Sequence, residues 1–175
     1  VLTAILPQLI QQHSPQALIC HLDFNRFINV QCSRPEAAGA LLWELREWAV
    51  ANGIPTPLAV KWETYEHLTA QLRALMSVFR DSGRTIYFLI DEVQRWFQVQ
   101  EPDYVLFKSL INVGGLHRKS LRFALTGSGM VQAWQGMIAC PANGTTVVAE
   151  SWVINLPAAD SPALLQFAAT RLIQH

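Results

Sequence analysis

Charged residues are scarce in this sequence. Of its 175 residues, 15% are Asp, Glu, Lys or Arg, against roughly 25% in ordinary soluble domains. Hydrophobic residues make up 51%. A disordered chain needs low hydrophobicity and high net charge, so this composition excludes one. The length favours a single domain with one core, because domains commonly hold about 100–200 residues.

An excess of charge of one sign is also missing, since there are 13 basic and 13 acidic residues. Proteins that bind mainly to phosphate backbones carry an excess of basic residues, so nucleic-acid binding stays possible but is not indicated by charge. Long hydrophobic runs are missing too. The apolar stretches 86–90 and 137–140 are far shorter than the roughly 18 residues of a membrane span, so we expect no membrane association.

Cysteine is rare and does not occur in pairs. Cys20, Cys32 and Cys140 form an odd set with no C-x-x-C spacing, which argues against a disulfide framework or a zinc knuckle. We therefore expect a cytoplasmic or otherwise intracellular protein. The chain begins at Val1 without a cationic leader, so we expect no signal peptide and expect that a longer protein contains it.

Helical and strand patterns alternate along the chain. Apolar spacings of three and four, with their capping and breaking residues, predict helices over 2–13, from Ser33 to Asn52, from Tyr65 to Ser82 and from Tyr104 to Gly114. Short apolar runs predict strands over 17–24, 85–90 and 121–125. Further patterns predict a helix over 130–137, a strand over 152–156 and a helix from Ser161. This alternation is typical of an α/β fold with a mostly parallel sheet.

Polar side chains follow three of the predicted strands. Asp23 ends the first, Asp91 and Glu92 end the second, and Thr126 with Ser128 follows the third. Ligands of parallel sheets bind at the carboxyl ends of the strands. A carboxylate pair at this edge suits nucleotide hydrolysis, with Asp91 holding a divalent cation and Glu92 orienting or deprotonating a water. Thr126 and Ser128 are then candidates to contact the terminal phosphate.

Each of these residues also has a purely structural interpretation. The acid pair can solvate the end of a strand, and residues 126–129 can form a glycine turn that caps a helix through Ser128. Asp23 is better interpreted as a side-chain cap of the turn that follows it than as a metal contact. The six tryptophans are expected to anchor the core or a protein interface rather than stack on bases.

Two stretches of the sequence resemble a known family. IYFLIDE, residues 86–92, resembles the Walker B strand of P-loop ATPases with its catalytic glutamate, and FALTGSG, residues 123–129, resembles their sensor-1 strand. The similarity is to the AAA+ and STAND groups, particularly the archaeal-type ATPases, whose patterns include a DE-hydrophobic-Q stretch similar to residues 91–94.

The resemblance implies a three-layer α/β/α fold that binds ATP and Mg²⁺. It implies that residues 17–23, 85–91, 121–127 and 152–156 are the second to fifth strands. It further implies roles for the site residues: Asp91 on the metal side through water, Glu92 polarising water, and Thr126 or Ser128 contacting the γ-phosphate.

One family motif, the phosphate-binding loop G-x-x-x-x-G-K-[ST], does not occur in the sequence. Because the family places this loop before a helix and its second strand, we expect it just upstream of Val1. Residues 1–157 would then form an ATPase core that lacks its first strand and phosphate loop, and 158–175 would begin a following helical region. The resemblance also leads us to expect the first strand between the third and fourth. The segment between residues 23 and 91 departs from the family, because it holds two predicted helices rather than one, so we expect an extra helical element there.

The expected function is therefore ATP hydrolysis that drives conformational switching or assembly in a larger protein, with protein partners or self-association. One alternative is a catalytically degenerate nucleotide-binding scaffold that binds a partner through its tryptophan-rich surface. Another is a nucleic-acid-associated ATPase, which the neutral charge disfavours.

Overall fold

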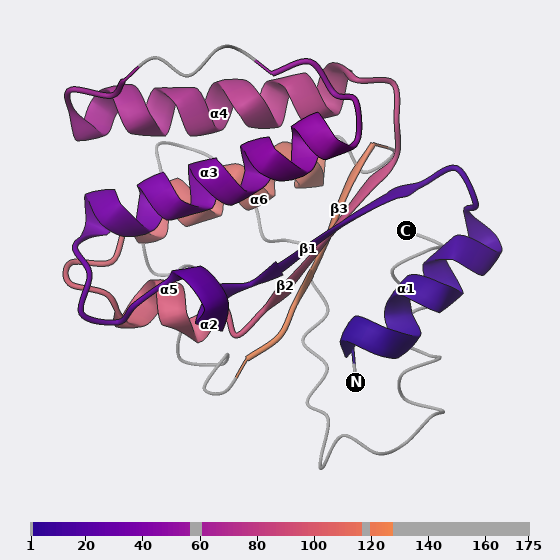
Figure 1. Ribbon diagram of the computed structural model, residues 1–175, viewed down its shortest axis with the longest axis horizontal. Coiled ribbons are helices and arrows are strands. Elements are labelled where there is room, and N and C mark those ends of the chain that lie inside the picture. The colour runs from indigo at the N-terminus through magenta and orange to yellow at the C-terminus, as the bar shows by residue number, and fades with distance from the viewer. Residues whose placement is uncertain (1, 57–60, 117–119, 128–175) are drawn as a thin grey trace.

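The computed structural model describes residues 2–56, 61–116 and 120–127 (Figure 1). The predicted helix over 130–137, the predicted strand over 152–156 and the whole of region 158–175 lie outside these residues. Those expectations stay predictions.

Three parallel strands form the sheet. They are β1 (Leu18–Asp23), β2 (Ile86–Asp91) and β3 (Leu121–Leu125), in the order β1-β2-β3. Asp23 pairs with Asp91 in the register of β1 and β2, and Ile90 pairs with Leu125 in that of β2 and β3. The three predicted strands and their parallel pairing are confirmed, and the strands end at a common edge.

Helices cover both faces of this sheet. In Figure 1, α1 (Leu2–His13) lies on one side, and α3 (Arg34–Ala51), α4 (Tyr65–Asp81) and α6 (Tyr104–Leu116) lie on the other. Two short helices are also present: α2 (Phe24–Phe27) follows β1 directly, and two residues separate the end of β2 from α5 (Gln94–Gln98). The four long helices agree with the sequence patterns. The two short ones were not predicted, because four or five residues are too few to show a helical period.

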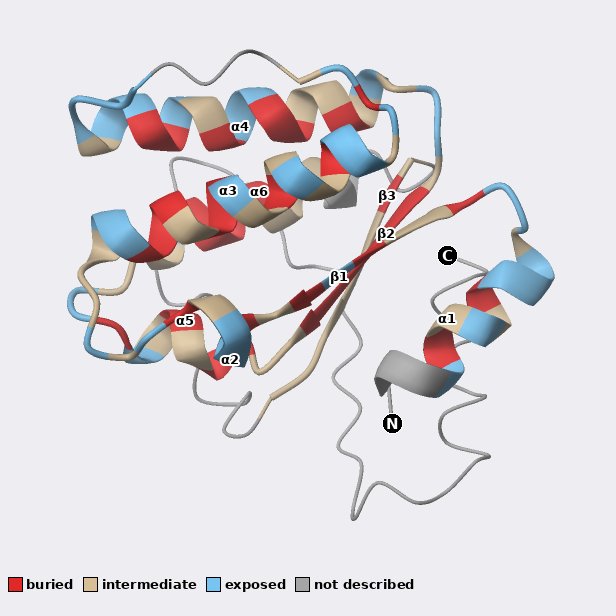
Figure 2. Cartoon of the chain, viewed as in Figure 1, coloured by how far each residue is buried: buried red, intermediate tan, exposed pale blue. Residues whose placement is uncertain are grey.

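The alternation of side chains along β2 explains why its sequence is apolar throughout. Ile86, Phe88 and Ile90 face the core under α3, α4 and α6, while Tyr87 and Leu89 face α1. All five are at most 5% exposed. A central strand covered on both faces has no solvent side, so it carries no polar alternation. Figure 2 shows this burial along the middle of the sheet.

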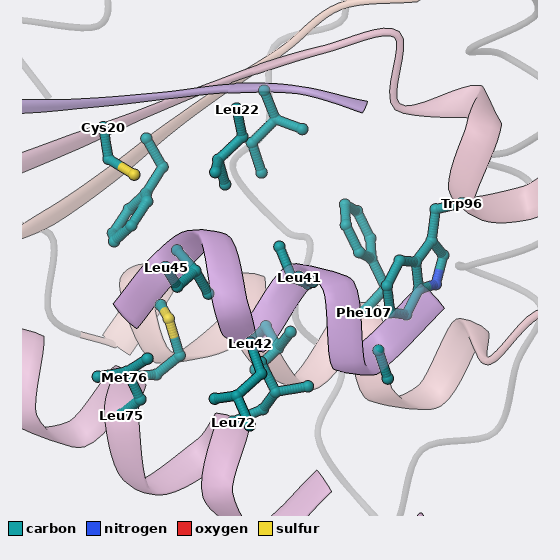
Figure 3. Close-up of a cluster of buried hydrophobic side chains, with 14 of the residues drawn as sticks. Cys20, Leu22, Leu41, Leu42, Leu45, Leu72, Leu75, Met76, Trp96 and Phe107 are labelled. Carbon is teal, nitrogen blue, oxygen red and sulfur yellow. The ribbon is translucent and has the colours of Figure 1, made fainter. Parts of the chain in front are cut away.

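The larger core lies between the sheet and the three long helices of one face. Figure 3 shows part of it, in which α3 contributes Leu41, Leu42 and Leu45 and α4 contributes Leu72, Leu75 and Met76. Phe79 at the end of α4 reaches the sheet, with its ring 5.6 Å from that of Phe88 and 5.7 Å from that of Trp48. Each fully buried large side chain contributes about 1.5–3 kcal/mol, so these contacts bind α4 to both α3 and β2.

The start of α3 carries the capping box that the sequence predicts. Glu36 Oε2 accepts hydrogen bonds from the backbone N–H and the hydroxyl of Ser33, both at 2.7 Å. These bonds lower the pKa of Glu36 because they favour its charged form. At the other end, Gly53 follows the last turn with φ 66°, a left-handed conformation that favours glycine.

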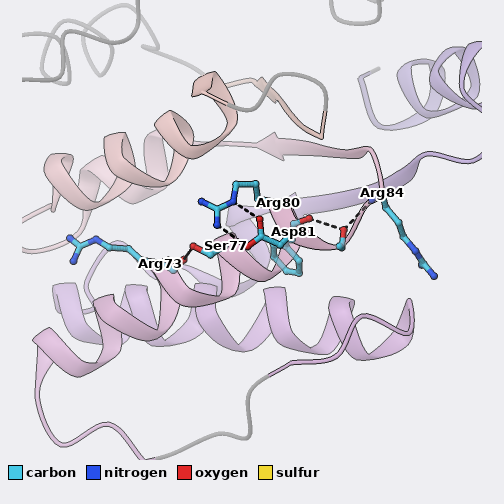
Figure 4. Close-up of polar contacts among 7 residues, drawn as sticks. Arg73, Ser77, Arg80, Asp81 and Arg84 are labelled. Carbon is cyan, nitrogen blue, oxygen red and sulfur yellow. Dashed lines mark hydrogen bonds and ion pairs between the residues drawn. The ribbon is translucent and has the colours of Figure 1, made fainter.

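The end of α4 leads into β2 through a short polar turn (Figure 4). The Ser82 hydroxyl donates to the carbonyl oxygen of Phe79 at 2.7 Å and accepts from the backbone N–H of Arg84 at 3.3 Å. Beside them, Arg80 Nε lies 2.7 Å from Asp81 Oδ1. An exposed ion pair of this kind adds little stability. The direction in which the chain enters β2 therefore depends mainly on the hydrogen bonds of the Ser82 turn.

The strand order corrects one expectation. Strands β2 and β3 pair directly from Ile86 with Leu121 to Ile90 with Leu125, so the expected first strand between them is wrong. Paired strands lie about 4.8 Å apart and leave no room for another. The outer edge of β1 is partly covered, because Trp48 Nε1 donates to the carbonyl oxygen of Ile19 at 3.0 Å. Within the described residues, no strand covers the outer edge of β3.

Two further expectations concern insertions and membranes. The connection from β1 to β2 holds both α3 and α4, which confirms the expected extra helix.

In the described parts of the chain, none of the helices combines the length and apolarity needed to cross a bilayer.

Candidate functional site

The carboxyl edge of the sheet brings most of the predicted site residues together. Asp23 and Asp91 are register partners at the ends of β1 and β2. The backbone N–H of Thr126, which follows β3, donates to the carbonyl oxygen of Ile90 at 2.9 Å. Ser128 lies outside the described residues. The edge therefore forms as the sequence predicts, and the individual contacts decide what each residue can do there.

Asp91 and Thr126 are in direct contact. The Thr126 hydroxyl donates a short hydrogen bond to Asp91 Oδ1, which also accepts the backbone N–H of Glu92 at 3.0 Å. The carbonyl oxygen of Thr126 accepts the backbone N–H of Val93 at 2.9 Å. The turn after β2 is thus joined to the turn after β3 by one side-chain and one backbone bond.

Glu92 occupies an unusual backbone conformation. Its φ is 57°, a left-handed value that non-glycine residues rarely adopt. Such a conformation costs of order 1–3 kcal/mol and occurs preferentially at functional sites. Its side chain is half-buried, and its Oε2 accepts a hydrogen bond from Gln94 Nε2 at 2.5 Å. A carboxylate that is held in place and still reached by water suits a general base.

Gln94 is the site residue whose importance the sequence did not reveal. It is only 8% exposed, and its Oε1 has no hydrogen-bond partner among the described residues. Leaving a buried acceptor unpaired costs about 1–3 kcal/mol, so its presence calls for an explanation. The DE-hydrophobic-Q pattern includes this position, but nothing in the sequence indicated that its side chain contacts Glu92 and Gly127.

Gly127 makes room for the Gln94 side chain. A Cβ at Gly127 would lie 2.0 Å from Gln94 Oε1 and 3.2 Å from the backbone nitrogen of Val93. Any larger residue would therefore collide with the turn after β2. The glycine that follows Thr126 is required by this close approach.

Asp23 has the structural role that the sequence favours. Its carboxylate accepts the backbone N–H of Asn25 at 3.0 Å, as the N-cap of α2. The capping interpretation of Asp23 is confirmed, and the site centres on the two neighbouring strands.

Asp91 and Thr126 place one carboxylate and one hydroxyl side by side at the sheet edge. In the part of the chain that the structure describes, no three His, Cys, Asp or Glu side chains gather to hold an ion. Mg²⁺ commonly takes only one or two carboxylates and completes its shell with water and substrate phosphates.

A shallow hollow adjoins this pair on the α1 side of the sheet. Besides Asp91 and Thr126, its lining is mostly apolar and includes Leu6, Leu89 and Ala124. At about 10 Å³, the hollow has room for about one water molecule beside the acid–hydroxyl pair.

The tryptophans divide between the core and the surface. Trp96 is 1% exposed and Trp48 packs against the core, whereas Trp43 and Trp62 are 61% and 43% exposed. Trp62 lies over Gly39 of α3, 3.0 Å from where a Cβ would stand, and Trp43 is one turn further along the same helix. The expected core role holds for two of them, and two lie on the outer surface around α3. Trp134 and Trp152 lie outside the described residues.

Comparison with protein-family models, with curated proteins and with solved structures found no match for this chain. Its function is therefore inferred from the residues and their geometry.

Proposed function

We propose that this chain carries the Walker B and sensor-1 part of a P-loop ATPase, in which Mg-ATP turnover drives conformational switching or assembly in a larger, intracellular protein. The observation that carries the proposal is the hydrogen-bonded pair of Asp91 and Thr126, with Glu92 beside it, at the ends of neighbouring parallel strands. Phosphoryl transfer needs positioned charge and a positioned water more than covalent chemistry by the protein.

Each residue has a distinct role in this proposal. Asp91 orders the water shell of Mg²⁺, and the ion, when bound, offsets the negative charge of the phosphates. Glu92 orients the attacking water and accepts its proton. Thr126, whose hydroxyl donates to Asp91, is the candidate to contact the terminal phosphate. Ser128 is a second candidate for that contact.

The topology supports a position for the phosphate loop. From β1 to β2 and from β2 to β3, the chain moves each time to the next strand on the same side of the sheet. The long helices of both connections pack on one face. Helix α1 lies on the opposite face. Because crossovers between parallel strands are right-handed, a connection through the opposite face runs in the reverse direction. A strand ahead of α1 then belongs beside the outer edge of β3, and the loop after it lies next to Thr126.

The first test is the coding sequence immediately upstream of Val1. A glycine-rich loop that ends in Lys-Ser or Lys-Thr is expected there, because its amides and lysine hold the phosphates. A protein without such a loop would contradict ATP hydrolysis by this domain.

The second test replaces the general base in the protein that includes this loop. We expect Glu92→Gln to keep Mg-ATP binding and to lower the turnover rate by about 100-fold or more, since general bases contribute 10²–10⁴-fold. The matched control is Glu101→Gln, because Glu101 is an exposed glutamate with a similar φ of 53°. Unchanged turnover in Glu92→Gln would remove Glu92 from the mechanism.

A second candidate function is a nucleotide-binding scaffold that does not hydrolyse ATP. The exposed indole rings of Trp43 and Trp62 favour it, because exposed aromatic residues are enriched at protein interfaces. It predicts a wild-type protein that binds Mg-ATP without turnover and whose association with a partner weakens in Trp43→Ala.

A further inference from the structure

Gln94 fills its site in a way that packing alone does not explain. It is 8% exposed at the start of α5, where a methionine of equal length would fill the space without a polar atom to satisfy. Its Oε1 is left without a partner among the described residues. Its Nε2 makes one hydrogen bond, to Glu92 Oε2 at 2.5 Å. The amide nitrogen thus makes the contact with Glu92, and this orientation leaves Oε1 without a partner among the described residues.

That one bond determines which oxygen of Glu92 is available. Oε2 receives Gln94, while Oε1 accepts no hydrogen bond from a residue that the structure describes. A carboxylate held by one oxygen cannot rotate freely, so its second oxygen keeps a defined direction. A defined direction is what a group that orients a water requires.

Gln94 is also in contact with the turn after β3. Its Oε1 lies so close to Gly127 that a Cβ there would stand 2.0 Å away. In the same turn, the carbonyl oxygen of Thr126 accepts the backbone N–H of Val93. A displacement of Thr126 and Gly127 therefore moves Gln94, and through it the carboxylate of Glu92.

We propose that Gln94 is a positioning residue that aligns the Glu92 carboxylate with the attacking water and couples it to the turn that carries Thr126. The proposal rests on the proposed ATPase function. Gln94 acts through Glu92 and through the neighbouring turn, and it contacts neither the nucleotide nor the water.

The experiment measures the turnover rate, KM, Mg-ATP binding and urea unfolding of the full-length protein carrying Gln94→Met, which keeps the length of the side chain and removes its donor. We expect kcat to fall about 10- to 100-fold, with KM and Mg-ATP binding within about twofold of wild type. The free energy of unfolding should change little, because the variant removes the unpaired Oε1 together with the hydrogen bond to Glu92. The matched control is Gln98→Met, an exposed glutamine at the other end of α5, which should leave all four quantities unchanged.

A double variant separates positioning from a general structural role. If Gln94 acts through Glu92, adding Gln94→Met to Glu92→Gln lowers the residual turnover no further. A further drop, or a loss of stability and nucleotide binding in parallel with kcat, would overturn the proposal. Where Gln94→Met does not fold, Gln94→Ala, which also removes the donor without adding a charge beside Glu92, gives the same test.

The two levels of the proposal fail in different ways. A wild-type protein with its phosphate loop and no ATP turnover would contradict the ATPase function itself. Turnover in the wild type together with unchanged kcat in Gln94→Met would overturn the role of Gln94 alone.

Discussion

Replacing Gly127 by alanine tests whether the turns after β2 and β3 are packed as one unit. The new Cβ would stand 2.0 Å from Gln94 Oε1, whereas ordinary van der Waals contacts begin at about 3.4 Å. The glutamine would have to withdraw by more than about 1 Å. Its hydrogen bond to Glu92, now 2.5 Å long, would then exceed the usual limit of about 3.2 Å.

The expected loss of stability follows from these two effects. Overpacking of a buried site costs typically 1–3 kcal/mol, and a hydrogen bond to a charged group contributes roughly 1.5–3 kcal/mol. Because the glutamine can relieve part of the clash by moving, we expect a net loss of about 2 kcal/mol. For a protein of this size that lowers Tm by about 4–8 °C.

A double-mutant cycle on urea unfolding identifies the cause. If the clash with Gln94 is responsible, Gly127→Ala should cost about 1–2 kcal/mol less in a Gln94→Ala background than in the wild type. The cost that remains there comes from the φ of 158° and the contact with the backbone nitrogen of Val93. Gly53→Ala is the matched control, because a Cβ there meets nothing within 4 Å. Alanine at position 53 would have to adopt the left-handed φ of 66°, which costs about 1 kcal/mol whichever residue stands at position 94.

Additive effects of Gly127→Ala and Gln94→Ala would refute this reasoning. So would a Gly127→Ala variant as stable as wild type, since it would show that the two turns are not in close contact.

Three further predictions concern the scaffold. Trp48→Phe should cost about 1–2 kcal/mol in urea unfolding, because it removes a 3.0 Å hydrogen bond to an edge carbonyl of β1, whereas the exposed Trp43 should tolerate Phe; equal losses would contradict this. Hydrogen bonds at the start of α3 lower the pKa of Glu36, so its stabilisation is present above the ordinary glutamate pKa and is lost as pH falls through the lowered one. Glu36→Gln should therefore weaken the acid dependence of unfolding, and an unchanged pH profile would exclude that role. Burial raises the pKa of the thiols of Cys20 and Cys32, and Cys20 is 0% exposed; peptide mapping after alkylation at about pH 8 should find Cys32 modified first, and equal rates would contradict the packing of Cys20.

Much of the fold could be predicted because its signals are local. The capping box of Ser33 and Glu36 and the glycine after α3 lie within a few residues of the helix ends that they define. The apolar run of β2 marks a strand buried on both faces. Asp91 and Thr126 were assigned to one edge because parallel strands end together, and their direct hydrogen bond agrees with that assignment.

The order of the strands could not be derived from such signals. Which strand pairs with β2 depends on hydrogen bonds between segments far apart in the chain, and the apolar patterns of β1 and β3 fit either neighbour. The resemblance to P-loop ATPases led to a first strand between β2 and β3, and the register from Ile86 with Leu121 to Ile90 with Leu125 excludes it.

The sequence by itself determined where the four long helices and the three strands of the described residues lie. It also determined which acidic and hydroxyl side chains follow the strands at the carboxyl edge, because periodicity and capping act over a few residues. Only the tertiary structure decided that β2 and β3 are neighbours, that Trp48 covers the edge of β1, and that Gln94 lies between Glu92 and Gly127. Most of those contacts, such as Trp48 with Ile19 and Gln94 with Gly127, join residues far apart in the chain, and the packing of the sheet and its helices brings them together.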